Sequence, residues 1–179
     1  MAMKRKQLML FSLGIAVLMA AILQIIGGDD KPVERRFLPE LQLGSDKITS
    51  VEVINSEGES LILAKKVAQG WQDESTGRKV AIMPLANLVQ QLAKAKVIAA
   101  ETSLPRNYVP LKMNVPGEEE GSAWKVVIRA GEEYEKEILV GALDKERGGQ
   151  FIRLEEDPSV FVIDRVLPLP QDANTWFDN

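Results

Sequence analysis

Residues 48–53 read Ile-Thr-Ser-Val-Glu-Val, and this stretch decides which kind of fold the chain is expected to form. Val51 and Val53 fall on one side of an extended backbone, whereas Ser50 and Glu52 fall on the other. Because successive side chains of a strand point to opposite faces, this alternation predicts a β-strand with one buried face.

The residues that follow predict a β-meander of three strands. Residues 56–59 (Ser-Glu-Gly-Glu) are typical of a turn, and residues 60–65 return as the second strand of a hairpin. Gln69-Gly70 indicates another turn, after which Trp71 begins a short third strand that ends near Asp73.

The hydrophobic period then changes from two to the period of a helix. After Pro84, apolar side chains recur at Leu85, Leu88, Val89 and Leu92, which is the spacing of an amphipathic helix ending near residue 96. Pro84 suits the first helical turn, where its missing N–H costs no hydrogen bond. The apolar stripe is expected to pack on the sheet. The alternative is that it forms a groove for a partner.

A second block of strands follows an acidic loop at residues 114–123. The pattern predicts a hairpin from residues 124–129 and 134–140, and another from residues 150–154 and 160–164. The two blocks have a similar layout, which suggests a weak internal repeat. The sequence therefore predicts an α+β fold, in which antiparallel hairpins or meanders pack with one main amphipathic helix.

The N-terminal region predicts a membrane anchor. Residues 8–26 (LMLFSLGIAVLMAAILQII) carry no charge, and as a helix they would be about 28 Å long, close to the thickness of a hydrocarbon core. Lys4, Arg5 and Lys6 precede this run and are expected to stay in the cytoplasm. The prediction is a transmembrane helix in residues 1–27 with its N-terminus inside, a tether in residues 28–47, and a periplasmic domain in residues 48–179.

Two other interpretations of this apolar run compete with the anchor. A cleaved signal peptide has a shorter apolar stretch and small residues before its cleavage site, whereas Leu18 or Met19 stands before Ala20-Ala21 here. A buried helix of a soluble domain is the other interpretation. The unbroken run through Ile26 favours an anchor that is retained, and so a single-pass protein of the inner membrane.

The composition excludes several classes of chemistry. The chain has no Cys and no His, so it lacks disulfides, thiolate nucleophiles and the commonest metal ligand and general base. Subtracting the +3 of residues 1–27 from the formal charge of −4 leaves −7 for residues 28–179. Such an acidic domain repels phosphate backbones, so we expect no nucleic-acid partner.

The remaining candidates for chemistry are weak. Ser122 and Lys125 have Ser-x-x-Lys spacing, but a β pattern places positions i and i+3 on opposite faces. Residues 118–120 and 155–157 are acidic runs without the ligand spacing of a calcium loop. Trp71, Trp124 and Trp176 are expected to be core residues. The alternative is that they form an aromatic platform. We therefore predict no catalytic, cofactor-binding or metal-binding residue, no cofactor and no enzymatic activity.

The order of these features resembles the bacterial family named domain of unknown function 4340. The resemblance is carried by Lys4-Arg5-Lys6 with the apolar run, by residues 47–53, Gly70-Trp71 and residues 92–97, and by residues 139–141, 148–153, 160–164, Leu169-Pro170 and Trp176. It implies an exported, membrane-tethered domain, associated with ABC-type export systems of the gliding-motility type, and supplies no catalytic residue.

Together these features predict a function in the cell envelope. The leading hypothesis is a membrane-anchored periplasmic accessory or scaffold protein with a protein partner in an envelope complex. The alternative is a periplasmic module that binds a lipid or glycan in a cavity between sheet and helix.

Overall fold

The structure, a computed structural model, describes residues 35–41, 47–118, 120–131 and 134–178. The predicted transmembrane segment in residues 1–27, and the tether up to residue 34, lie outside the described residues. Within the described part of the chain, no helix combines the length and the apolar character needed to cross a membrane.

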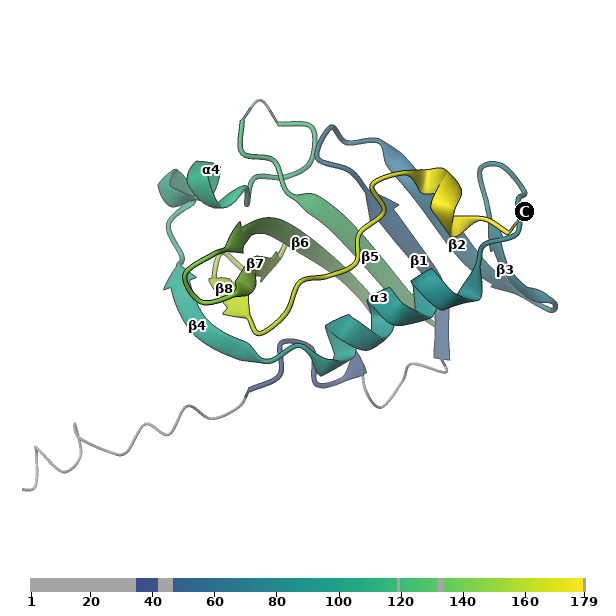
Figure 1. Cartoon of the computed structure of the whole chain (residues 1–179), viewed down its shortest axis with the longest axis horizontal. Coiled ribbons are helices and arrows are strands. Elements are labelled where there is room, and N and C mark those ends of the chain that lie inside the picture. The colour runs from purple at the N-terminus through teal and green to yellow at the C-terminus, as the bar shows by residue number, and fades with distance from the viewer. Residues whose placement is uncertain (1–34, 42–46, 119, 132–133, 179) are drawn as a thin grey trace, which may run out of the picture. The chain divides into compact units, whose positions relative to one another are not determined.

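Eight strands form one antiparallel sheet in the order β3-β2-β1-β5-β6-β7-β8-β4 (Figure 1). The strands are β1 (Ile48–Ile54), β2 (Ser60–Val67), β3 (Gly70–Asp73), β4 (Val97–Thr102), β5 (Trp124–Ala130), β6 (Tyr134–Asp144), β7 (Gly149–Leu154) and β8 (Val160–Ile163). The helical elements are α3 (Ile82–Lys94), α4 (Tyr108–Leu111) and the 3-10 turns η2 (Pro105–Asn107) and η3 (Ala173–Trp176).

The predicted α+β fold with two β blocks was wrong. The two blocks are joined in a single sheet because β1 pairs with β5 as well as with β2, with Val51 opposite Ile128 and Val53 opposite Val126. This pairing satisfies backbone groups that would otherwise lie along open edges of two separate sheets. The described α-helices are short, with 13 residues in α3 and four in α4, so the sheet dominates the fold.

The predicted amphipathic helix is present, shifted by two residues at each end. Pro84 lies in its first turn, and Leu85, Leu88 and Leu92 are at most 2% exposed. These leucines pack on one face of the sheet, where the C-terminal segment also lies (Figure 1). The C-terminal segment contributes Trp176 and Phe177 to the same core.

A smaller core lies on the opposite face of the sheet, at the β6-β7-β8 end. Tyr108 of α4 and Met113 pack there against Leu139, Phe151 and Val162. The Tyr108 hydroxyl donates a hydrogen bond to the carbonyl oxygen of Pro158 at 2.6 Å. Both faces of this end of the sheet are therefore covered, whereas the same face of β2, β1 and β5 carries charged side chains.

Candidate functional site

The two residues of the Ser-x-x-Lys spacing have different surroundings. The Ser122 hydroxyl donates to the carbonyl oxygen of Glu118 at 2.8 Å. The Lys125 ammonium instead lies 2.9 Å from a Glu155 carboxylate oxygen and 3.3 Å from one of Glu137. Ser122 and Lys125 thus take part in separate sets of polar contacts.

The second acidic run is used for local ion pairs and a turn. Glu155 pairs with Lys125, and Glu156 pairs with Lys136 at 2.6 Å. Asp157 accepts the backbone N–H of Ser159 at 2.8 Å. Within the described ranges, no group of three or more carboxylates is arranged to hold a metal ion.

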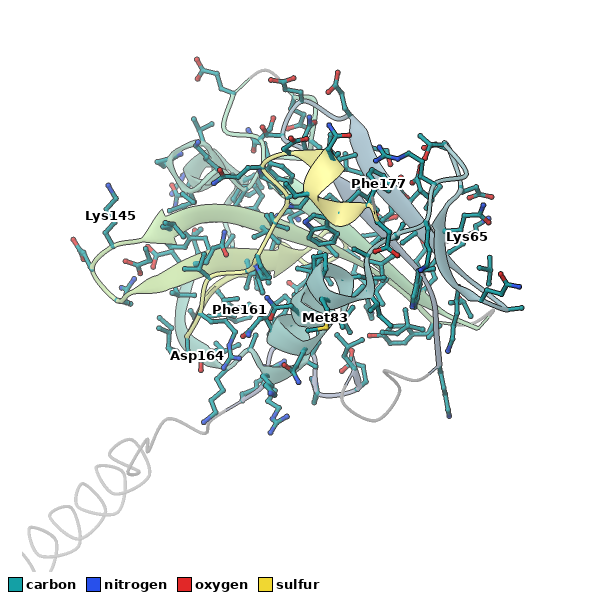
Figure 2. All side chains as sticks on the ribbon, turned by 45° about the vertical axis from the view of Figure 1, so that its right-hand side comes forward. Lys65, Met83, Lys145, Phe161, Asp164 and Phe177 are labelled. Carbon is teal, nitrogen blue, oxygen red and sulfur yellow. The ribbon has the colours of Figure 1, made fainter. Side chains whose placement is uncertain are left out.

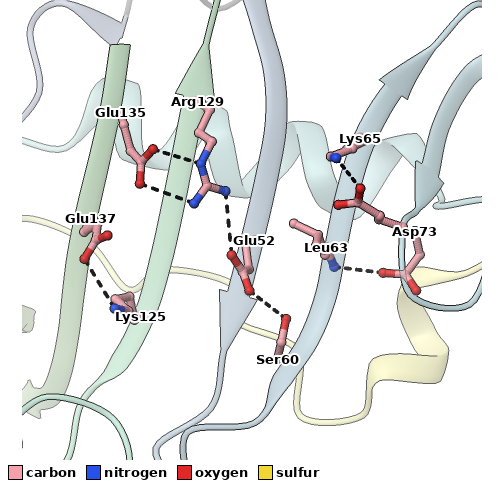
Figure 3. Close-up of polar contacts among 10 residues, drawn as sticks. Glu52, Ser60, Leu63, Lys65, Asp73, Lys125, Arg129, Glu135 and Glu137 are labelled. Atoms are coloured by element: carbon pink, nitrogen blue, oxygen red, sulfur yellow. Dashed lines mark hydrogen bonds and ion pairs between the residues drawn. The ribbon is translucent and has the colours of Figure 1, made fainter. Parts of the chain in front are cut away.

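Ion pairs run across the charged face of β1, β5 and β6 (Figure 3). The Arg129 guanidinium donates to both oxygens of Glu135, at 3.0 and 3.3 Å, and lies 3.7 Å from a carboxylate oxygen of Glu52. Glu52 also accepts a hydrogen bond from the Ser60 hydroxyl at 2.9 Å. Opposite charges on neighbouring strands support the register of the sheet, and this face already pairs its own charges.

Lys125 lies between two carboxyl groups whose pKa values move in opposite directions. A hydrogen bond to Glu155, together with burial, raises the pKa of Glu137, although Lys125 opposes this shift. Burial tends to raise the pKa of Glu155, but hydrogen bonds from Lys125 and Glu137 outweigh it and lower that pKa. Glu137 is thus the member of the pair that holds a proton more readily.

A groove lies where β6 bulges away from β7. The pairing of the two strands shifts between Val140 and Leu143, so Gly141 and Ala142 have no partner on β7. A side chain at Gly141 would be impossible without movement, because a Cβ there would lie 2.4 Å from the carbonyl oxygen of Leu111. Glycine therefore lets the segment after α4 lie directly on the bulge.

The side chain of Gln150 forms hydrogen bonds to both the bulge and the C-terminal segment. Its amide nitrogen donates to the carbonyl oxygen of Gly141 at 3.1 Å, and its amide oxygen accepts the backbone N–H of Leu167 at 2.9 Å. Gln150 is only 6% exposed. Since both ends of this buried amide are satisfied, the two walls of the groove are held in fixed relative positions.

The groove has an apolar floor and a basic rim. Its volume is about 530 Å³. It is lined by Ser56, Lys112, Ser122, Trp124, Val140, Gly141, Ala142, Leu143, Lys145, Gln150, Leu167, Leu169, Pro170 and Gln171. The lining contains two lysines and no carboxylate, although residues 28–179 carry an excess of acidic side chains.

Lys112 has an unusual backbone conformation for its residue type. With φ 54° and ψ 55° it lies in the left-handed region, where it is the one described residue other than glycine. Its backbone N–H donates to the carbonyl oxygens of Tyr108 and Val109 in α4. A non-glycine residue in this region carries strain of about 1 kcal/mol or more, and such strain is frequent at binding sites.

The outward surface of α3 is a second candidate site. We name it the α3 face and define it by Ile82, Met83, Ala86, Asn87 and Gln90, the exposed residues between Ile82 and Gln90; Lys94, in the last turn of α3, is exposed but is not part of it. Ile82 and Met83 are 60% and 76% exposed, and Met83 is labelled on α3 in Figure 2. A hollow of about 500 Å³ lies on this face, lined by Met83, Pro84, Ala86, Asn87 and Gln90. None of these residues is charged.

Sequence reasoning predicted neither site. One signal for the groove was present, because Gly141 interrupts an otherwise continuous strand pattern, and such a glycine often marks a bulge or a close backbone contact. The basic rim has no local signal, since Lys112 and Lys145 are far apart in sequence. The α3 face is simply the side of the helix opposite to the predicted apolar stripe.

No family model matches the chain, so the resemblance to domain of unknown function 4340 stays an expectation. No curated protein and no solved structure matches it either.

Proposed function

We propose that the protein is a non-enzymatic accessory or scaffold subunit of an envelope complex. In this proposal the apolar run in residues 8–26 holds it at the outer side of the cytoplasmic membrane, and the α3 face docks on a partner protein. The observation that carries the proposal is the exposure of two large apolar side chains, Ile82 and Met83, on an α3 face that contains no charged residue.

The composition of the α3 face supports protein docking. Interface cores are depleted of charged residues and enriched in Met, which adapts its shape to a partner. Ile82 and Met83 expose most of their side chains, and exposed apolar groups gain free energy when a partner removes them from water. A solvated helix surface usually carries charged residues instead.

Buried side chains and a backbone hydrogen bond fix α3 to the rest of the domain. Leu85, Leu88 and Leu92 are buried in the main core, and the N–H of Ala81, just before the helix, donates to the carbonyl oxygen of Trp176 at 2.8 Å. The start of α3 is therefore fixed where Ile82 and Met83 are exposed. A surface that is ordered before binding loses less conformational entropy on docking.

The partner that fits this face is an uncharged, apolar protein surface, such as a helix of a membrane-complex subunit. A strongly charged partner would have to be desolvated against a face that offers no opposite charge, which is unfavourable. A second copy of the chain is a competing occupant, and the experiment below separates the two.

The alternative function, binding of an envelope lipid or glycan, requires a cavity. The sequence-based hypothesis expects that cavity between sheet and helix. There, however, the described core side chains are fully buried and pack together, among them Leu88, Leu92, Val51 and Ile138. A ligand site must therefore lie elsewhere, and the groove over the β6 bulge is the feature that favours this second candidate.

Site-specific photo-crosslinking in the native cells tests the proposed function. A photoreactive residue is placed at Met83 or, as a control, at Glu59, which is exposed in the β1–β2 turn. We expect one adduct from Met83 with an identified membrane protein, reproduced by crosslinking from that protein back to the α3 face. Equal adducts from Glu59, or an adduct only with a second copy of this chain, would overturn the proposal.

A further inference from the structure

We propose that the groove over the β6 bulge binds single-chain amphiphiles with an anionic head group. The head lies between Lys112 and Lys145, and the chain lies on the apolar floor. This site rests on the second candidate function and specifies its ligand. It shares no lining residue with the α3 face, so either proposal can fail without the other.

The floor of the groove suits an alkyl chain. Trp124 and Leu169 are half-buried, and Leu143 leaves 51% of its surface exposed. Each methylene that leaves water for such a surface gains free energy, and the volume of about 530 Å³ lies within the range of small-molecule sites. One aromatic ring in the lining is less than a glycan platform normally provides, so an alkyl chain is the better match.

The rim selects the charge of the head group. Among the described residues, neither Lys112 nor Lys145 has an ion-pair partner. The carboxylate next to Lys145 is engaged elsewhere, because Asp144 accepts from the Arg147 guanidinium at 2.7 Å and from two backbone N–H groups. Two ammonium groups without a carboxylate in the lining leave an anion as the complementary ligand.

The two lysines lie directly after two ordered elements of the fold, α4 and β6. Lys112 is held in its left-handed conformation at the end of α4, and Lys145 lies in the turn between β6 and β7 (Figure 2). Gln150 joins the bulge to the segment that carries Leu167, as described above. The groove is thus formed before a ligand arrives, which lowers the entropic cost of binding.

The test uses the full chain in native membranes and a diazirine-bearing fatty acid as the probe. After irradiation, the labelled peptides are identified by mass spectrometry. We expect labelling of peptides that contain Trp124, Leu143 or Leu169. The matched fatty alcohol tests whether the anionic head is needed, and excess inorganic phosphate tests whether the head alone competes. We expect the alcohol to label about tenfold less and phosphate to leave labelling unchanged, because the site needs both parts of the ligand.

Charge-removing variants locate the head group. Lys112→Gln with Lys145→Gln should reduce labelling about tenfold, since two charge-assisted contacts are lost. Lys47→Gln with Lys94→Gln removes the same net charge at exposed positions outside the groove and should leave labelling unchanged. All four positions are exposed, so the variants should fold, which an unfolding curve checks.

A third variant probes the floor. Leu143→Glu places a carboxylate where the alkyl chain is expected, and Leu143 is exposed enough for the domain to tolerate the change. Labelling should again fall about tenfold. Three results would each overturn the proposal. The Lys112→Gln, Lys145→Gln double variant could label as strongly as wild type, or the fatty alcohol could label as strongly as the fatty acid. The third is no labelling of the groove, which is the result expected if a protein segment occupied it.

Discussion

The side-chain amide nitrogen of Gln150 lies 3.1 Å from the carbonyl oxygen of Gly141 and donates a hydrogen bond to it across the bulge of β6. The other end of the same amide accepts the N–H of Leu167. One buried side chain therefore links the interrupted strand to the C-terminal segment, and this link predicts how the domain responds to substitution.

Gln150→Leu should lower the free energy of unfolding by about 2 kcal/mol. The leucine has a similar size but removes the hydrogen-bond partner of the half-buried Gly141 carbonyl and of the buried Leu167 N–H, and an unsatisfied buried group costs about 1–3 kcal/mol. Urea unfolding followed by tryptophan fluorescence measures the change. Gln171→Leu, at an exposed position, is the control and should change stability by less than about 0.5 kcal/mol.

Gly141→Ala should destabilise the domain by about 3 kcal/mol. Its Cβ would lie 2.4 Å from both the Leu111 carbonyl oxygen and the Met113 Cε, and the backbone oxygen cannot move without displacing the segment after α4. Gly131→Ala is the comparison, because a Cβ there meets nothing within 4 Å but carries the strain of φ 65°. If both variants lose the same stability in urea, close packing at Gly141 is not the cause.

Asp73→Asn should lower stability near pH 7 by about 2 kcal/mol. Asp73 is 1% exposed and accepts hydrogen bonds from the Leu63 N–H at 2.8 Å and from the Ser75 and Thr76 hydroxyls at 2.6 and 2.7 Å. Burial alone raises the pKa of Asp73, but these hydrogen bonds outweigh it and hold the pKa below its usual value of 3.8.

The lowered pKa fixes the direction of the pH dependence at Asp73. The stability that its carboxylate contributes is fully present above about pH 4 and is lost as pH falls through the lower, folded-state pKa. Unfolding free energies of wild type should thus fall below pH 4, and those of Asp73→Asn should fall less steeply. Equal slopes would show that Asp73 does not titrate as described. Glu57→Gln, which removes one exposed carboxylate, is the control.

Glu137→Gln should be neutral or stabilising near pH 7, by less than about 1 kcal/mol, since the side chain is 38% exposed. The pKa of Glu137 is raised above 4.5, so the folded protein binds more protons than the unfolded chain just above that pH. Stability from this group therefore increases as pH falls through the raised pKa. The difference in unfolding free energy between Glu137→Gln and wild type should therefore shrink as pH is lowered from 8 to 5.

Glu135→Gln provides the contrast for this prediction. It breaks the bidentate contact with Arg129, so it should lower stability near pH 7 by up to about 1 kcal/mol. A loss of stability in Glu137→Gln as large as that in Glu135→Gln would contradict the raised pKa of Glu137.

The local elements of the fold were largely predictable from sequence. Burial of one face of a strand or helix leaves a pattern within a short stretch of sequence. Such patterns are the alternation at Val51 and Val53 and the spacing of Leu85, Leu88 and Leu92, which are all buried. The union of the two blocks was missed because it depends on Val51 pairing with Ile128, and no local pattern reports a contact across 77 positions. Bringing such distant residues together costs loop-closure entropy, and this cost is offset only when the whole sheet forms.

The candidate sites were less accessible to sequence reasoning. Lys112 and Lys145 line the same groove, and the segment that carries Lys112 packs directly on Gly141. The sequence shows this glycine but not the segment that it contacts. The sequence showed the α3 face as the polar side of a helix. Its lack of charged residues indicates a docking surface only once the structure shows that Ile82 and Met83 are exposed.

The most direct test of the proposed function is the mass of the native complex around the full chain, extracted from its own membranes in a mild detergent and measured by native mass spectrometry. We expect a hetero-complex with an identified membrane protein, which Met83→Glu dissociates and Glu59→Lys leaves intact. A lone monomer, a homo-oligomer, or a complex that Met83→Glu does not affect would contradict it.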